Sequence, residues 1–175
     1  VYLPTDRYQT DKLTRYLAKT NESAYVRMGR DPVPDVYTEG DPFIPGKANV
    51  LAEGRDITLI ATGEAVFHAL KAHNILKEKG INARVIDMHT LKPLDTDIII
   101  RAASETGHII TVEEHSIYGG LGASVAEVVV QSSPVKMKII GIPDENVIHA
   151  SPQDIFKHYG LTSENIVNEA IRLLR

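Results

Sequence analysis

Two acidic residues and a histidine, Glu113, Glu114 and His115, directly follow the apolar run 108–112. Such a run, bounded by Gly107, predicts a buried parallel strand, and sites in open α/β sheets collect where strands end. His115, with carboxylates beside it, is therefore the best candidate for acid–base chemistry or hydrogen bonding. A metal site is a weaker interpretation, because the chain has no HExxH motif and adjacent residues of an extended segment point to opposite faces.

A glycine-rich turn follows these side chains. Gly119, Gly120 and Gly122 precede an apolar helical stretch over residues 123–129. Glycine at a helix entry permits a sharp turn and the close approach of a neighbour. The spacing G-G-x-G differs from the dinucleotide-binding pattern, which places GxGxxG between a strand and a helix. These residues favour a structural role, a tight helix entry packed against another surface, over a ligand site.

Basic side chains that could meet an anion lie elsewhere. Arg27 and Arg30 are three residues apart at the end of a strand-like stretch, SAYVRM. The forked guanidinium suits phosphate or carboxylate, but salt bridges to the acidic segment that follows are an equally good interpretation. Lys92, within HTLKPLD, could also meet an anion, although a structural turn fixed by Pro93 is favoured.

Length and composition exclude several classes of protein. A chain of 175 residues holds one good core, or one domain and a piece of another. A net charge of −4 without a run of like charge argues against nucleic acid, and no apolar run approaches the ~18 residues of a membrane helix. The absence of Cys excludes disulfides and thiolate zinc sites and is consistent with the cytoplasmic location that we expect. Because the first residue is Val1 and not Met, we expect the chain to be the remainder of something longer.

Three segments differ in their patterns. Residues 1–30 read as one strand–helix–strand unit, which is too small to bury its own faces. Residues 31–56 contain four prolines among scattered apolar residues, as in a linker that lies on a surface. From residue 57 to 175, apolar runs alternate with helical patterns. This alternation predicts an α/β fold, a Rossmann-like and mostly parallel sheet flanked by helices.

Residues with capping side chains mark the predicted helix starts. Asp6, Asp95 and Thr162 each precede a helical pattern, and Ser151 is followed by proline at the first helical position. Strands are predicted at residues 1–3, 23–28, 57–61, 83–88, 108–112 and 135–140.

The order of several motifs resembles a known family. The stretches are ESAYVRMGRDPVP, EGRDITLIATGEAVFHALKA, ARVIDMHTLKPLD, TVEEHSIYGGLGASVAEV and YGLTSENI. Together they resemble the C-terminal part of transketolases, most closely the C-terminal subunit of split transketolases, in which two chains carry the enzyme.

Two related families share the domain. Deoxyxylulose-phosphate synthase has a similar KPLD and GG-x-G pattern but usually Asn in place of His115, and the beta subunits of 2-oxoacid dehydrogenases share less of the GGLG stretch. A stand-alone α/β interaction or ligand-binding module is the remaining alternative.

The resemblance implies a division of the chain and an activity. Residues 1–30 would be the C-terminal remnant of a pyrimidine-binding domain, 31–56 a linker and 57–175 the transketolase C-terminal domain. The implied reaction transfers a two-carbon ketol unit between sugar phosphates, as in the pentose phosphate pathway. Thiamine diphosphate and a divalent metal (Mg or Ca) serve that reaction in the full enzyme. We expect neither to bind this chain alone, and we expect the isolated chain to be inactive.

The resemblance also assigns residues and partners. Arg30 matches an arginine that binds the sugar phosphate, although the residue before it is Gly where many single-chain transketolases have Ser. No catalytic residue is expected in this chain. The implied partners are the N-terminal, diphosphate-binding subunit and a second copy, which together form a homodimer through the C-terminal domain. Interface candidates are Glu113, Glu114, His115, Gly119, Gly120 and Gly122.

Overall fold

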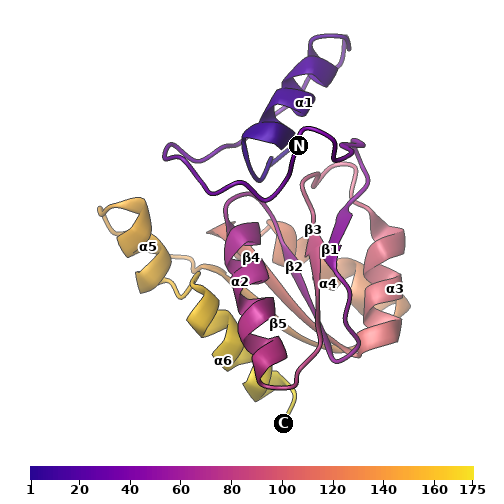
Figure 1. Ribbon diagram of the computed structural model, residues 1–175, viewed down its shortest axis with the longest axis vertical. Coiled ribbons are helices and arrows are strands. Elements are labelled where there is room, and N and C mark those ends of the chain that lie inside the picture. The colour runs from indigo at the N-terminus through magenta and orange to yellow at the C-terminus, as the bar shows by residue number, and fades with distance from the viewer.

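A computed structural model describes all 175 residues and contains one five-stranded sheet with the order β1-β3-β2-β4-β5. Its strands are β1 (Asn49–Ala52), β2 (Ile57–Ala61), β3 (Ala83–Asp87), β4 (His108–Ser116) and β5 (Lys136–Ile142) (Figure 1). β2, β3, β4 and β5 pair in parallel, and only β1 runs antiparallel, against β3. The prediction of a Rossmann-like, mostly parallel sheet is confirmed.

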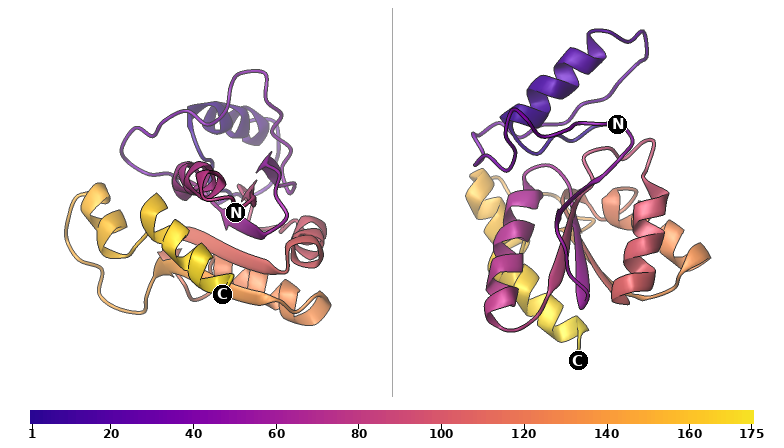
Figure 2. Two further views of the ribbon diagram at one scale, coloured as in Figure 1. Left: turned by 60° about the horizontal axis from the view of Figure 1, so that its bottom comes forward. Right: turned by 45° about the vertical axis from the view of Figure 1, so that its right-hand side comes forward.

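Helices cover both faces of this sheet, as the two views in Figure 2 show. One face carries α2 (Ala65–Glu78) and α6 (Ser163–Leu173), and the other carries α3 (Thr96–Thr106) and α4 (Leu121–Ser132). Successive strand residues alternate between the two layers. Leu59 packs in the cluster beneath α2, whereas its neighbour Ile60 packs in the cluster beneath α3 and α4. Because both faces are covered, β2 and β3 are buried along their whole length.

An N-terminal arm lies across the edge of the sheet where the parallel strands end (Figure 1). We use this name for residues 1–30, which contain α1 (Arg7–Leu17). Its first residues hydrogen-bond to the chain after β3, with the N–H of Leu3 donating to His89 O at 2.8 Å. The predicted strands 1–3 and 23–28 form only isolated bridges, because Tyr2 pairs in parallel with Val26 and antiparallel with Thr90.

The four predicted helix starts are confirmed, but one of the four residues makes no capping hydrogen bond. Asp6, Ser151 and Thr162 each accept a hydrogen bond from a backbone N–H in the first turn of α1, α5 (Pro152–His158) and α6. Asp95 precedes α3 but makes no capping bond. Its carboxylate instead accepts from the N–H of Ala48 at 3.0 Å, so a tertiary contact replaces the local one.

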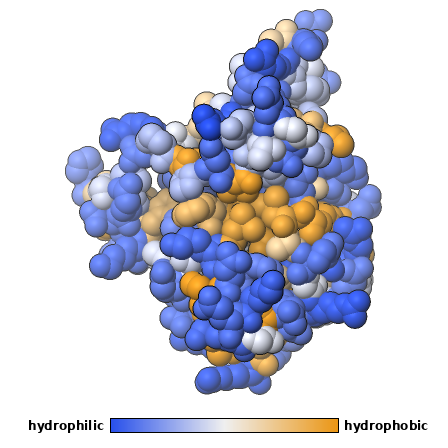
Figure 3. All heavy atoms as spheres, in the orientation of Figure 1, coloured by the Kyte–Doolittle hydropathy of each residue, from blue (hydrophilic) through white to orange (hydrophobic).

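Part of the expected linker is a strand. Residues 49–52 form β1, which the proline-rich pattern of residues 31–56 did not predict. In Figure 3, apolar side chains gather in a band across the middle of the molecule below the arm, while the visible arm is mostly hydrophilic. No helix is both long enough and apolar enough to cross a membrane.

Candidate functional site

The ends of β2 and β4 carry the acidic residues that face the arm. Glu64 follows β2 and immediately precedes α2, and Glu114 lies near the end of β4. The last residues of the arm pass over both. A guanidinium N–H of Arg27 donates to Glu114 Oε2 at 3.5 Å, and Gly29 lies against the Glu64 side chain. The structure therefore brings the two predicted features, the acidic run and the arginines, to one edge of the sheet.

The Glu113 side chain accepts hydrogen bonds from the first turn of the helix that follows it. Its side chain is buried, and its two carboxylate oxygens accept from the N–H of Leu121 at 2.7 Å and of Gly122 at 2.8 Å. Burial raises the pKa of this carboxyl, while the two backbone hydrogen bonds act in the opposite direction. A carboxylate at this position compensates the partial positive charge of the N-terminus of α4.

The glycines of the turn are explained by close packing. A Cβ built on Gly120 would overlap the Glu113 carboxylate, and one built on Gly122 would overlap the side chain of Ile139. Gly119 has φ = +72°, a backbone conformation that favours glycine. This geometry supports a structural helix entry. The expected role of these glycines in an interface between subunits stays a prediction.

His115 and Glu114 differ in their surroundings. Glu114 pairs with Arg27 inside the chain, whereas His115 is exposed and its Nδ1 lies 3.1 Å from Ser116 O. His115 lines a pocket of about 280 Å³ together with Arg27 and Lys92. Of the acidic run and its histidine, His115 is therefore the side chain most open to a partner.

Arg30 has a free guanidinium. Its side chain is 91% exposed, and its nearest charged partner is Asp31, with Nε 3.8 Å from Oδ1. Gly29 and Asp31, on either side of it, line a pocket of about 470 Å³, but Arg30 itself does not, and the other charged residues of the lining are Asp6, Arg7, Asp11 and Glu64. A guanidinium placed in this way can bind an anion with two of its N–H groups.

A buried carboxylate that the sequence analysis did not single out joins the arm to the sheet. Asp87, the last residue of β3, is fully buried, and its Oδ2 accepts from Gln9 Nε2 at 2.7 Å and from the hydroxyl of Tyr37 at 2.6 Å. Its Oδ1 has no hydrogen-bond partner. Burial raises the pKa of Asp87 to about 7, although hydrogen bonds from Tyr37 and Gln9 oppose that change. A charged residue at the end of the apolar run ARVID was the available signal.

His89 is buried two residues further on. Its Nδ1 lies 2.9 Å from Thr90 Oγ1, its ring stacks on Phe43 with centroids 4.5 Å apart, and its Nε2 has no partner. Burial lowers the pKa of His89 to about 4, so the ring is neutral at pH 7. Asp87 and His89 are thus two buried titratable groups beneath the arm and the segment after it.

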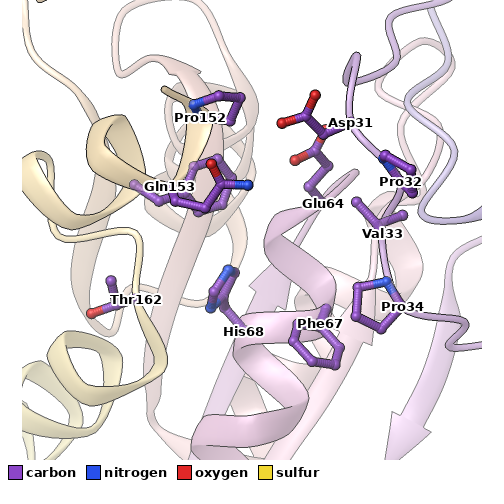
Figure 4. A pocket seen from close by; sticks show the side chains of 11 residues that line it. Asp31, Pro32, Val33, Pro34, Glu64, Phe67, His68, Pro152, Gln153 and Thr162 are labelled. Atoms are coloured by element: carbon purple, nitrogen blue, oxygen red, sulfur yellow. The ribbon is translucent and has the colours of Figure 1, made fainter. Parts of the chain in front are cut away.

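A further pocket of about 220 Å³ lies between the segment 31–34, α2 and α5 (Figure 4). His68 stands on its wall with Phe156, their ring centroids 5.2 Å apart, and Glu64 and Asp31 lie at its rim. Burial lowers the pKa of His68, and Nδ1 of this ring has no hydrogen-bond partner. The pocket shares Glu64 and Asp31 with the pocket beside Arg30.

The residues of this chain do not fit a metal-bound diphosphate. No group of three or more His, Asp or Glu side chains is arranged to hold a metal ion. The N–H groups at the glycine-led start of α4 could in principle bind a phosphate, but the Glu113 carboxylate already occupies two of them. This edge of the sheet offers a ligand the exposed guanidinium of Arg30 and the pocket lined by Arg27, Lys92 and His115.

Comparisons with known proteins give a consistent result. Residues 46–166 match the family described as "Transketolase, C-terminal domain". The chain is 52% identical over 176 residues to a subunit of the apulose-4-phosphate transketolase of Phocaeicola vulgatus, a match that covers 100% of this chain and 56% of that protein. The chain thus spans little more than half the length of that relative.

A solved structure and a more distant relative extend the comparison. A structure titled "Split gene transketolase, inactive beta4 tetramer" superposes with a TM-score of 0.94 at 37% identity, covering 99% of this chain and 57% of that one. The 1-deoxy-D-xylulose-5-phosphate synthase of Desulforudis audaxviator is 44% identical over 127 residues, but this covers only 71% of this chain and 20% of that enzyme.

Proposed function

The chain belongs to the transketolase C-terminal domain family, and from that premise we propose that it is the C-terminal subunit of a split transketolase. It acts with a second subunit that carries the diphosphate-binding domain. The assembly transfers a two-carbon ketol unit from a ketose phosphate to an aldose phosphate. The observation that carries this proposal is the similarity, along the whole chain, to one subunit of a transketolase.

In this proposal the chain contributes binding of the sugar. Arg30 holds the anionic end of the substrate, which is supported by its exposed guanidinium. The proposed division of the chain is a pyrimidine-domain remnant over residues 1–30, a linker over 31–56 and the C-terminal domain over 57–175.

Thiamine diphosphate with a divalent metal would supply the carbanion chemistry and is assigned to the partner subunit. The residues of this chain bind and orient the sugar and hold the arm on the sheet. We also propose that two copies of the chain meet at the end of β4 and the glycine turn, where His115 and Gly119 are exposed. The cytoplasm is the proposed location of the assembly.

Mixing the subunits tests the proposal. The chain, as its gene encodes it, is assayed alone and with a diphosphate-domain subunit, in the presence of thiamine diphosphate, Mg²⁺ and a pair of sugar phosphates. We expect ketol transfer only in the mixture, and only with the cofactor present. Turnover by the chain alone would contradict the proposed division of labour.

A second candidate function is part of a deoxyxylulose-phosphate synthase, which the shared identity over 127 residues supports. That reaction uses a 2-oxoacid donor and releases carbon dioxide. The same mixture, supplied with a 2-oxoacid and an aldose phosphate, distinguishes the two candidates. We expect no carbon dioxide release above that of the partner subunit alone.

A further inference from the structure

Arg30 lies in a loop that is held at both ends. Before it, the N–H of Arg27 donates to Tyr2 O at 3.0 Å, and the Arg27 side chain pairs with Glu114 on β4. After it, the N–H groups of residues 36 and 37 donate to one carboxylate oxygen of Asp6 at 2.8 and 2.7 Å. Between these anchors, the position of Arg30 depends on what the loop touches along the sheet edge.

The Glu64 side chain fills the space beside Gly29 that a Cβ would occupy. A Cβ built on Gly29 would overlap Glu64 Oε1 and would lie 3.3 Å from its Cγ. Gly29 does not have a positive φ, so its backbone conformation does not require glycine. Gly29 leaves room for the end of the Glu64 side chain, so a Cβ at residue 29 has to displace either that side chain or the loop.

Glu64 is placed by a rigid element. It immediately precedes α2, with a helical backbone conformation, and its side chain caps no backbone N–H of that helix. Burial raises the pKa of Glu64 and the charge of Glu114 adds to this, while Arg27 opposes them. The side chain forms a wall shared by the pocket beside Arg30 and the pocket in Figure 4. The loop at Gly29 packs against this side chain.

We propose that Glu64 and Gly29 form a matched pair that sets the position of Arg30, which makes Glu64 a positioning residue for the anionic end of the sugar. This inference rests on the proposed role of Arg30 in ketol transfer. The physical reason is geometric, because a guanidinium binds two oxygens of an anion only when its backbone is correctly placed. A displacement of ~1 Å at such a group can lower a rate by ~100-fold.

The test is a double-mutant cycle in the assembled enzyme. Gly29→Ala adds a Cβ that must displace either the loop or the Glu64 side chain. We expect it to raise KM for a phosphorylated sugar by ~10-fold, with little effect on KM for the unphosphorylated sugar. Glu64→Ala makes room for that Cβ, so the double variant should recover to within ~3-fold of wild type.

Two variants serve as matched controls. Gly40→Ala adds a Cβ that meets only Thr38 Oγ1, at 4.0 Å, and should leave KM unchanged. Glu78→Ala removes an exposed carboxylate at the far end of α2 and should also have no effect. Thermal unfolding midpoints of all variants show whether a change in KM reflects a loss of fold.

The outcomes separate this inference from the proposed function. One outcome is that wild type transfers ketol units while Gly29→Ala and Glu64→Ala act additively on KM. In that case the inferred matching of Glu64 and Gly29 is wrong, and the proposed function stands. Equal rises in KM for phosphorylated and unphosphorylated sugars would also overturn the positioning role. If the wild-type assembly transfers nothing, the proposed function falls, and the inference falls with it.

Discussion

Different interactions stabilise the N-terminal arm and the α/β body, by which we mean the five-stranded sheet and the helices that cover it. The body is built around two apolar clusters of 18 and 11 buried residues, one on each face of the sheet. The arm is joined to that body by polar contacts, with the carboxylates of Asp87 and Glu114 bonded to Gln9 and Arg27, and by backbone hydrogen bonds such as that of Leu3 with His89. Figure 3 shows the same contrast, a hydrophilic arm above an apolar band. Since apolar packing does not titrate and carboxylates do, pH and salt should act mainly on the arm.

This difference bears on function, because the proposed anion-binding residue lies in the arm. The body supplies a rigid edge, and polar contacts decide how Arg30 is presented on it. Substitutions in the two regions should therefore differ in size, in pH dependence and in salt dependence.

The largest effect is expected in the body. Leu59 is fully buried in the cluster beneath α2, and Leu59→Ala should lower the free energy of unfolding by about 2–5 kcal/mol, because it leaves a cavity. Urea unfolding at several pH values measures this loss, which should not vary with pH. Val130→Ala, at an exposed position, is the control and should change stability by less than about 0.5 kcal/mol. A pH-dependent loss at Leu59 would break the contrast.

Next in size are two opposing effects of pH on stability, which come from Asp87 and His89 beneath the arm. The folded-state pKa of Asp87 is raised to about 7, so its contribution to stability is full below the ordinary pKa of 3.8 and is lost as pH rises through 7. The pKa of His89 is lowered from 6.5 to about 4, so its contribution is full above pH 6.5 and is lost as pH falls through 4. At 1.36 kcal/mol per pKa unit, each effect amounts to about 3–4 kcal/mol.

Replacing either of these two residues should leave only the pH dependence of stability that the other one causes. Relative to wild type, Asp87→Asn should lose stability as the solution is acidified, because the His89 effect then acts alone. His89→Gln should lose stability as pH is raised, because the Asp87 effect remains. Urea unfolding of both variants between pH 4 and 8 measures the two slopes. Parallel curves for both variants and wild type would show that these buried groups do not govern the docking of the arm.

The smallest effect is expected at the ion pair between Arg27 and Glu114, which is partly exposed. Arg27→Ala should lower stability by about 1 kcal/mol or less, and the difference from wild type should shrink in 1 M salt because exposed charges are screened. Arg15→Ala, which breaks an exposed pair with Asp11 within α1, is the matched control. A loss at Arg27 that is independent of salt would show that packing, and not charge, holds this end of the arm.

Features that depend on residues close in sequence were predictable. The apolar runs indicated β2, β3, β4 and β5, and local capping chemistry located the starts of α1, α5 and α6. The motifs identified the family. These signals suffice because residues adjacent in sequence determine a buried strand and a capped helix start.

Features set by distant contacts were not predictable. Asp95 has the chemistry of a cap, but it bonds to Ala48, 47 residues away in sequence. β1 lies in a proline-rich stretch and is a strand only because it pairs with β3. The contact between Glu64 and Gly29 and the burial of Asp87 likewise arise from the placement of the arm on the sheet. No local pattern encodes such a placement.

The most direct test of the central claim is the effect of Arg30→Ala on ketol transfer by the chain assembled with a diphosphate-domain subunit. Steady-state kinetics are compared for a phosphorylated sugar and for the same sugar without its phosphate. We expect KM for the phosphorylated sugar to rise by ~10-fold or more, equivalent to ~1.4 kcal/mol of lost binding, and KM for the unphosphorylated sugar to stay unchanged. Equal behaviour of wild type and variant toward the phosphorylated sugar would contradict this expectation.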